Sequence, residues 1–185
     1  MAGLVNSTQG MPQQAQTPMP MQAPAPQAGS ALKNPVLAQI VTAVEAKVSP
    51  QLKTQYTNIT LAYQKMMTNP KASAGVMQRL KSTPDVLGNI ASGVSNFLGA
   101  LYLESQKRMS LPAAMPASIY VACHVMDLAE QSGLIKINAQ NAADCIHATT
   151  DATMKVFGVS DAQVHQSVAA GHQAAQQKQP MQAGA

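Results

Sequence analysis

Between residues 33 and 176, apolar positions recur at the three- and four-residue spacing of helices, and nowhere do they alternate with the period of two that a strand requires. The clearest stripe lies in residues 50–68, at intervals of four, three, four and three: Leu52, Tyr56, Ile59, Tyr63 and Met66. Similar stripes predict further helices over 35–48, 70–82, 84–108, 116–132 and 139–157. A last helix over 161–176 is predicted from a capping box formed by Ser160 and Gln163. We therefore predict an all-α fold, a bundle of about six to seven short helices.

Residue pairs typical of helix starts support these boundaries. Ser, Thr or Asn followed by Pro occurs four times, as Asn34-Pro35, Ser49-Pro50, Asn69-Pro70 and Thr83-Pro84. The polar side chain accepts a hydrogen bond from a free first-turn N–H group, and Pro lacks an N–H that would have no partner at the next position. The pairs predict helices that begin at residues 35, 50, 70 and 84. Asn138 is predicted to cap a later helix, and Gly133 and Gly158 to follow the ends of two helices.

The two ends of the chain differ from this region in composition. Residues 1–32 contain five prolines and no charged side chain, which argues against a helix, a strand or a packed core. Residues 177–185 are rich in Ala and Gln. We predict a disordered tail over 1–32, a helical domain over 33–176 and a second disordered tail over 177–185.

The helix predicted over 84–108 has two unlike faces. One is a stripe of bulky apolar residues, and the other is a strip of small residues, Gly88, Ser92, Ser95 and Gly99, at intervals of four, three and four. A glycine inside a helix costs about 1 kcal/mol relative to alanine, so an interaction should offset this cost. Because small side chains let a second helix approach closely, we expect this strip to pack against another helix or another subunit.

The charge of the chain is low and unevenly distributed. Charged residues make up 11% of the sequence, against about 25% in typical domains, and low charge favours association. Residues 33–108 hold nine Lys and Arg but three Asp and Glu. This excess makes Lys65, Lys71, Arg79 and Lys81 candidates for contact with an anionic surface, including non-specific contact with nucleic acid. The alternative is that they are ordinary solvated positions on helices.

Two cysteines and two neighbouring histidines are the candidates for metal binding. Cys123 and His124 diverge by about 100° on a helix, and Cys145 and His147 by about 200°, so neither pair can hold one ion from a regular helix. A nucleophile built from Cys145 or Cys123 with His124 and Asp127 remains open, although no sequence motif supports it. We predict two buried free thiols in a reducing compartment, no catalytic residue, no metal, no cofactor and no small-molecule substrate.

Two uncharged runs of 18 residues, 86–103 and 109–126, raise the question of a membrane. They are separated by the charged stretch 104–108, so residues 86–126 resemble a helical hairpin that inserts into a bilayer. Asn89, Asn96, His124 and several prolines make both runs poor spans. No basic region followed by an apolar run marks a secretory signal at the N-terminus.

Three stretches carry a resemblance to a known class of protein: NPVLAQI at 34–40, LGALYLESQ at 98–106 and VFGVS at 156–160. With the Pro/Gln/Met-rich tail, residues 33–168 resemble small structural or internal virion proteins of short-tailed bacteriophages. The resemblance implies a non-enzymatic virion component, internal and ejected with the genome or close to the portal, made in the host bacterial cytoplasm. It implies partners among other virion proteins or copies of the chain. The alternative is a membrane-active protein that inserts the 86–126 hairpin during genome delivery or lysis.

Overall fold

The structure, a computed structural model, describes residues 32–159, and over this range the chain is all-α, as the apolar spacing predicts. The helices are α1 (Pro35–Glu45), α2 (Pro50–Thr68), α3 (Pro70–Lys81), α4 (Val86–Glu104), α5 (Leu111–Gln131) and α6 (Ala139–Val156). The first 31 residues of the predicted N-terminal tail, the helix predicted over 161–176 and the tail predicted over 177–185 lie outside the described residues. Leu32, which the sequence analysis assigns to the tail, packs against the core.

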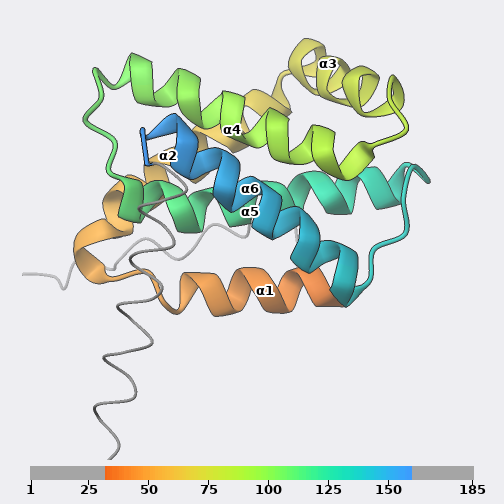
Figure 1. Cartoon of the computed structure of the whole chain (residues 1–185), viewed down its shortest axis with the longest axis horizontal. Coiled ribbons are helices and arrows are strands. Elements are labelled where there is room, and N and C mark those ends of the chain that lie inside the picture. Colours follow the sequence, from red (N-terminus) through yellow and green to blue (C-terminus); the bar gives the residue numbers. More distant parts are fainter. Residues whose placement is uncertain (1–31, 160–185) are drawn as a thin grey trace, which may run out of the picture.

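Helix α5 forms the centre of the bundle. It packs against α1, α2, α4 and α6, and 12 of its 21 residues are buried. Figure 1 shows α5 between α4 and α1, with α6 crossing in front of it. Five of the buried residues of α5 are alanines, which let several helices approach the same helix closely: Ala113, Ala114, Ala117, Ala122 and Ala129. Helix α3 packs mainly on α2 and α4, at the edge of the bundle.

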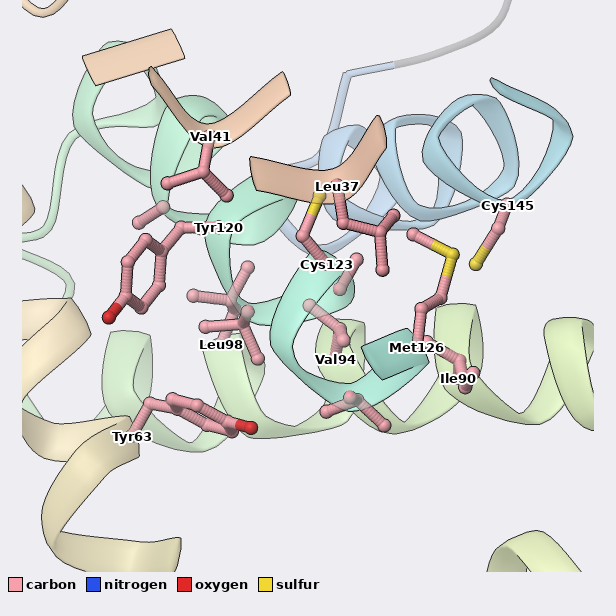
Figure 2. Packing of buried hydrophobic residues seen from close by; sticks show 14 of the residues in the cluster. Leu37, Val41, Tyr63, Ile90, Val94, Leu98, Tyr120, Cys123, Met126 and Cys145 are labelled. Carbon is pink, nitrogen blue, oxygen red and sulfur yellow. The ribbon is translucent and has the colours of Figure 1, made fainter. Parts of the chain in front are cut away.

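The core is filled from both sides of α5. Figure 2 shows Leu37 and Val41 of α1 pointing towards α5, with Ile90, Val94 and Leu98 of α4 on its other side. The predicted stripe of α2 supplies three buried residues: Tyr56, Ile59 and Tyr63. The predicted apolar faces therefore do point inward, since apolar side chains leave water when the helices pack.

Most predicted helix starts are confirmed. The side chain of Asn34 accepts hydrogen bonds from the N–H groups of Val36 and Leu37, and Asn69 caps α3 in the same way. Asn138 and Asn141 form a reciprocal capping box at the start of α6. Gly133 and Gly158 follow the ends of α5 and α6 with φ angles of 72° and 74°, the left-handed conformation that glycine adopts without steric cost.

The start predicted from Thr83-Pro84 is wrong, because α4 begins two residues later. Asp85 is the N-cap, and its carboxylate accepts from the N–H of Gly88 at 2.9 Å. The hydroxyl of Thr83 instead accepts from the side chain of Asn89. A carboxylate at the first turn also interacts favourably with the positive end of the helix dipole, which favours Asp85 as the cap.

The predicted boundaries around the next turn are also wrong. Helix α4 ends at Glu104 instead of residue 108, because Gln106 and Lys107 adopt positive φ angles of 53° and 61°. Helix α5 begins at Leu111 instead of residue 116, and Pro116 lies inside it. A tertiary contact fixes this earlier start, since the backbone N–H and the hydroxyl of Ser110 both donate to Gln55 of α2.

Candidate interaction surfaces

The C-terminal end of the strip of small residues on α4, at Gly99, packs against α6 of the same chain. A Cβ atom built on Gly99 would lie 3.6 Å from Cγ1 of Val156, so the helices meet closely at this point. Ser95 is buried and Ser92 is half-buried. At Gly88 a different contact favours glycine, because a Cβ atom there would collide with the carboxylate of Asp85, which caps the helix.

Further contacts continue along the same pair of helices. The thiol of Cys145 donates to the carbonyl oxygen of Leu87 at 3.7 Å, and the rings of Tyr102 and Phe157 lie 4.6 Å apart between centroids. Because early residues of α4 meet early residues of α6 and late residues meet late ones, the two helices run in the same direction, as Figure 1 shows. The helix that approaches the strip is therefore α6, and this contact leaves Gly99 no room for a second subunit.

A second strip on α4 faces away from the core. It consists of Ser92, Asn96, Ala100 and Leu103, at intervals of four, four and three residues, and we call it the outer strip. Leu103 is 67% exposed, Asn96 and Ala100 are exposed, and none of the four is charged. From Asn96 to Leu103 the outer strip is therefore an uncharged surface one helix wide that residues 32–159 leave open to solvent, and Ser92 at its start is half-buried.

Two helices in the described part of the chain are long and apolar enough to cross a membrane by length and composition. They are α4, with a mean hydropathy of 1.3, and α5, with 1.2. In the most apolar 18-residue segment of each helix, the fold buries 61% of the segment in α5 and 33% of the segment in α4. Most of the bulky apolar side chains of α4 are nevertheless buried or packed against the core, and the exception is Leu103, which is 67% exposed.

The four basic candidates are all exposed. Lys65 lies in the last turn of α2, where a positive charge suits the helix dipole. Lys71 begins α3, and Arg79 and Lys81 lie in its last turn. Arg79 and Lys81 are two positions apart and so diverge by about 200° around the helix. Arg79 and Lys81 therefore do not share one face of α3, and the anionic-surface role of the four residues stays a prediction.

The two thiols are buried and free, in the environment of inert cysteines. Burial raises the pKa of Cys123 to about 12 and that of Cys145 to about 11, so little of the nucleophilic thiolate exists near neutral pH. Burial lowers the pKa of His124, whose ring lies 4.3 Å from that of Tyr120 between centroids. Among the residues that the structure describes, no three His, Cys, Asp or Glu side chains are placed to hold a metal ion.

Sequence reasoning missed the role of two carboxylates at the end of α5. Asp127 accepts hydrogen bonds from the backbone N–H groups of Lys33 and Asn34, at 3.1 and 2.9 Å. Glu130 accepts from the side chain of Asn34 at 2.7 Å and from the N–H of Ile137 at 2.9 Å. These hydrogen bonds hold the segment before α1 and the segment before α6 against the central helix, α5.

Asp127 is therefore already engaged by backbone N–H groups and is not free to orient His124. The feature of the sequence that could have indicated this role is the pair of acidic residues, Asp127 and Glu130, three positions apart on an otherwise apolar helix.

Comparisons of the chain with models of protein families, with curated proteins and with solved structures find no match. Its function is therefore argued from its residues and from their arrangement.

Proposed function

We propose that this chain is a non-enzymatic structural protein that assembles through the outer strip of α4, which packs against the same strip of a second copy. The observation that carries the proposal is the exposed, uncharged outer strip, which ends at Leu103, a bulky apolar side chain that is 67% exposed. A second copy would bury Leu103 and Ala100, which is favourable in proportion to the apolar area removed from water.

The composition of the outer strip suits a neighbouring helix. Ser92 and Ala100 are small enough for two backbones to approach, and Leu103 supplies an exposed apolar side chain that a partner can bury. No charge in the strip has to be desolvated when the surface closes. A two-fold symmetric pair would place each strip against itself, the commonest arrangement in oligomers.

The chemistry of the described side chains agrees with a non-enzymatic role. The raised pKa values of both thiols disfavour a cysteine nucleophile. The ring of His124 packs among tyrosines, and Asp127 is engaged by backbone N–H groups. The reading as a small cysteine enzyme, which the sequence leaves open, therefore gains no support from this geometry.

A place in a virus particle is the finer part of the proposal. It rests on the resemblance of residues 33–168 to virion proteins of short-tailed bacteriophages, with a position inside the particle or close to the portal. The partners would be other virion proteins as well as copies of the chain. Quantitative mass spectrometry of purified particles should find the chain at a fixed copy number, and its absence from intact particles would refute the virion assignment.

The assembly is tested by light scattering of the full chain during size-exclusion chromatography. We expect the wild type to elute as a dimer, twice the 19.3 kDa of one chain. Ala100→Glu should elute as a monomer, because it places a charge in the closed interface. Gln78→Glu, an exposed position on α3, is the matched control and should remain dimeric. A wild type that is monomeric at every concentration, or a dimer that survives Ala100→Glu, would contradict the proposal.

The second candidate is insertion of the 86–126 hairpin into a membrane, which two consecutive apolar helices favour. Insertion would have to remove α5 from its contacts with α1, α2 and α6. Liposome flotation in low and physiological salt tests it, with vesicles of neutral and of anionic lipid. Flotation that survives salt, with release of vesicle contents, would support insertion. Flotation that salt abolishes would reflect only charge attraction by the basic residues of 33–108, and no flotation would exclude insertion under these conditions.

A further inference from the structure

A pocket of about 290 Å³ lies between α2, α3, α4 and α5. Its walls are mostly apolar, and they include Tyr63, Met66, Val76, Leu80, Ile90 and Phe97. Arg79 is the charged residue of the lining, and Asn89 adds a polar group. Pockets that bind small molecules share this character, with apolar walls and few polar groups that orient the ligand.

Two glycines of the lining set this pocket apart from an accidental gap in packing. Gly75 lies inside α3 and Gly93 inside α4, where glycine destabilises a helix relative to alanine. A Cβ atom built on either of them would meet no atom within 4 Å, so no neighbouring group requires glycine there. Gly99 and Gly88 differ, since the first contacts α6 and the second leaves room for the cap. What Gly75 and Gly93 share is the pocket, which a side chain at either position would narrow.

We propose that this pocket binds a single unbranched aliphatic chain with an anionic head group, such as a medium-chain fatty carboxylate. A volume of about 290 Å³ corresponds to about ten groups the size of water at about 30 Å³ each, which is enough for one such chain. The exposed guanidinium of Arg79 has no hydrogen bond or ion pair with the rest of residues 32–159. It is therefore available to a carboxylate, which it recognises through paired N–H groups. This proposal is independent of the assembly through α4.

The binding of an aliphatic chain between the pocket walls is tested by calorimetric titration of the full chain with decanoate. We expect saturable binding to the wild type, and binding to Gly93→Leu weaker by about tenfold or more, the scale on which a pocket discriminates by one or more carbon groups. Gly93→Leu should unfold at the same temperature as the wild type or higher, because leucine is the better helix former and its Cβ meets open space. Gly93→Ala is the milder companion variant, with smaller effects in the same directions.

Thr54→Ala provides the matched control for helix propensity. This exposed position on α2 lies outside the pocket lining, so the substitution should stabilise its helix and leave decanoate binding unchanged. No binding of decanoate to the wild type, or unchanged binding to a folded Gly93→Leu, would overturn the proposal.

The anionic head group is tested by comparing decanoate with decanol. Arg79→Gln should weaken decanoate binding up to about fivefold, the range of exposed ion pairs, and leave decanol binding unchanged. Lys81→Gln removes the same charge from the other side of α3, outside the lining, and should affect neither ligand. Equal affinity of the wild type for decanoate and decanol would overturn the assignment of an anionic ligand.

Discussion

The hydroxyl group of Thr153 is fully buried in α6, and within residues 32–159 it has no hydrogen-bond partner. One turn earlier, the equally buried hydroxyl of Thr149 donates to the carbonyl oxygen of Cys145 at 2.8 Å. The two residues share a helix, a degree of burial and a side-chain shape. They differ in whether the polar group removed from water finds a partner, which decides its effect on stability.

We expect Thr153→Val to raise the free energy of unfolding by about 1 kcal/mol, because it replaces an unpaired buried hydroxyl with a methyl group of similar shape. Thr149→Val should lower it by about 1 kcal/mol, because it removes a hydrogen bond. Urea denaturation of both variants measures the difference. Equal effects of the two substitutions would show that pairing of the hydroxyl does not decide the outcome.

The lowered pKa of His124 predicts how the free energy of unfolding depends on pH. Burial lowers its pKa below the usual 6.5, and the charge of Asp127 offsets this only in part. Below pH 6.5 the unfolded chain therefore binds more protons at this residue than the folded chain. The contribution of His124 to the free energy of unfolding should be fully present above pH 6.5 and decrease as the pH falls towards the folded pKa. Urea denaturation from pH 7.5 to 5 should show a smaller decrease for His124→Gln than for the wild type.

At the scale of helices, Gly99 illustrates why a strip of small residues does not identify its partner. Sequence spacing predicts close approach by another helix or another subunit, and the geometry places α6 there. Gly88, Gly93 and Gly99 look alike in the sequence, yet one clears space for a cap, one lines a pocket and one contacts a helix. These differences arise from tertiary contacts, which helical periodicity does not encode.

The contact at Gly99 leads to a prediction with opposite signs for two substitutions. Gly99→Ala should stabilise the fold by up to about 1 kcal/mol through helix propensity, because its Cβ would lie at an ordinary contact distance of 3.6 Å from Val156. Gly99→Leu should destabilise it by about 1–3 kcal/mol, because the larger side chain forces α4 and α6 apart. Thermal unfolding followed by circular dichroism measures both. Stabilisation by leucine would show that α6 does not restrict this position.

Helix boundaries were predictable where local residues determine them and not where distant residues do. Asn34 and Asn69 cap α1 and α3 with their own side chains, so the local sequence suffices. Helix α5 begins before Pro116 because Gln55, 55 residues before Ser110, accepts two hydrogen bonds from that residue. The pocket was not predictable either, since its walls come from four helices.

At the scale of the molecule, burial is concentrated in the centre and decreases towards one edge. Helix α5 contacts four helices and buries 12 residues, whereas α3 packs mainly on α2 and α4 and buries only Leu80. Local opening requires less free energy where fewer apolar contacts are lost. Opening of α3 would expose the pocket whose wall it forms, so the least buried helix would also give a ligand access.

Hydrogen exchange of backbone amides should therefore show two levels of protection. We expect amides inside α5 to exchange only with global unfolding, and those in the second half of α3 to exchange faster through local opening. Saturation with decanoate should slow exchange in α3 more than in α1, because the ligand stabilises the closed state of the helix that it contacts. If α3 were as protected as α5 without ligand, the helix would be part of the global folding unit. The pocket would then have to admit its ligand through its existing opening and not by movement of α3.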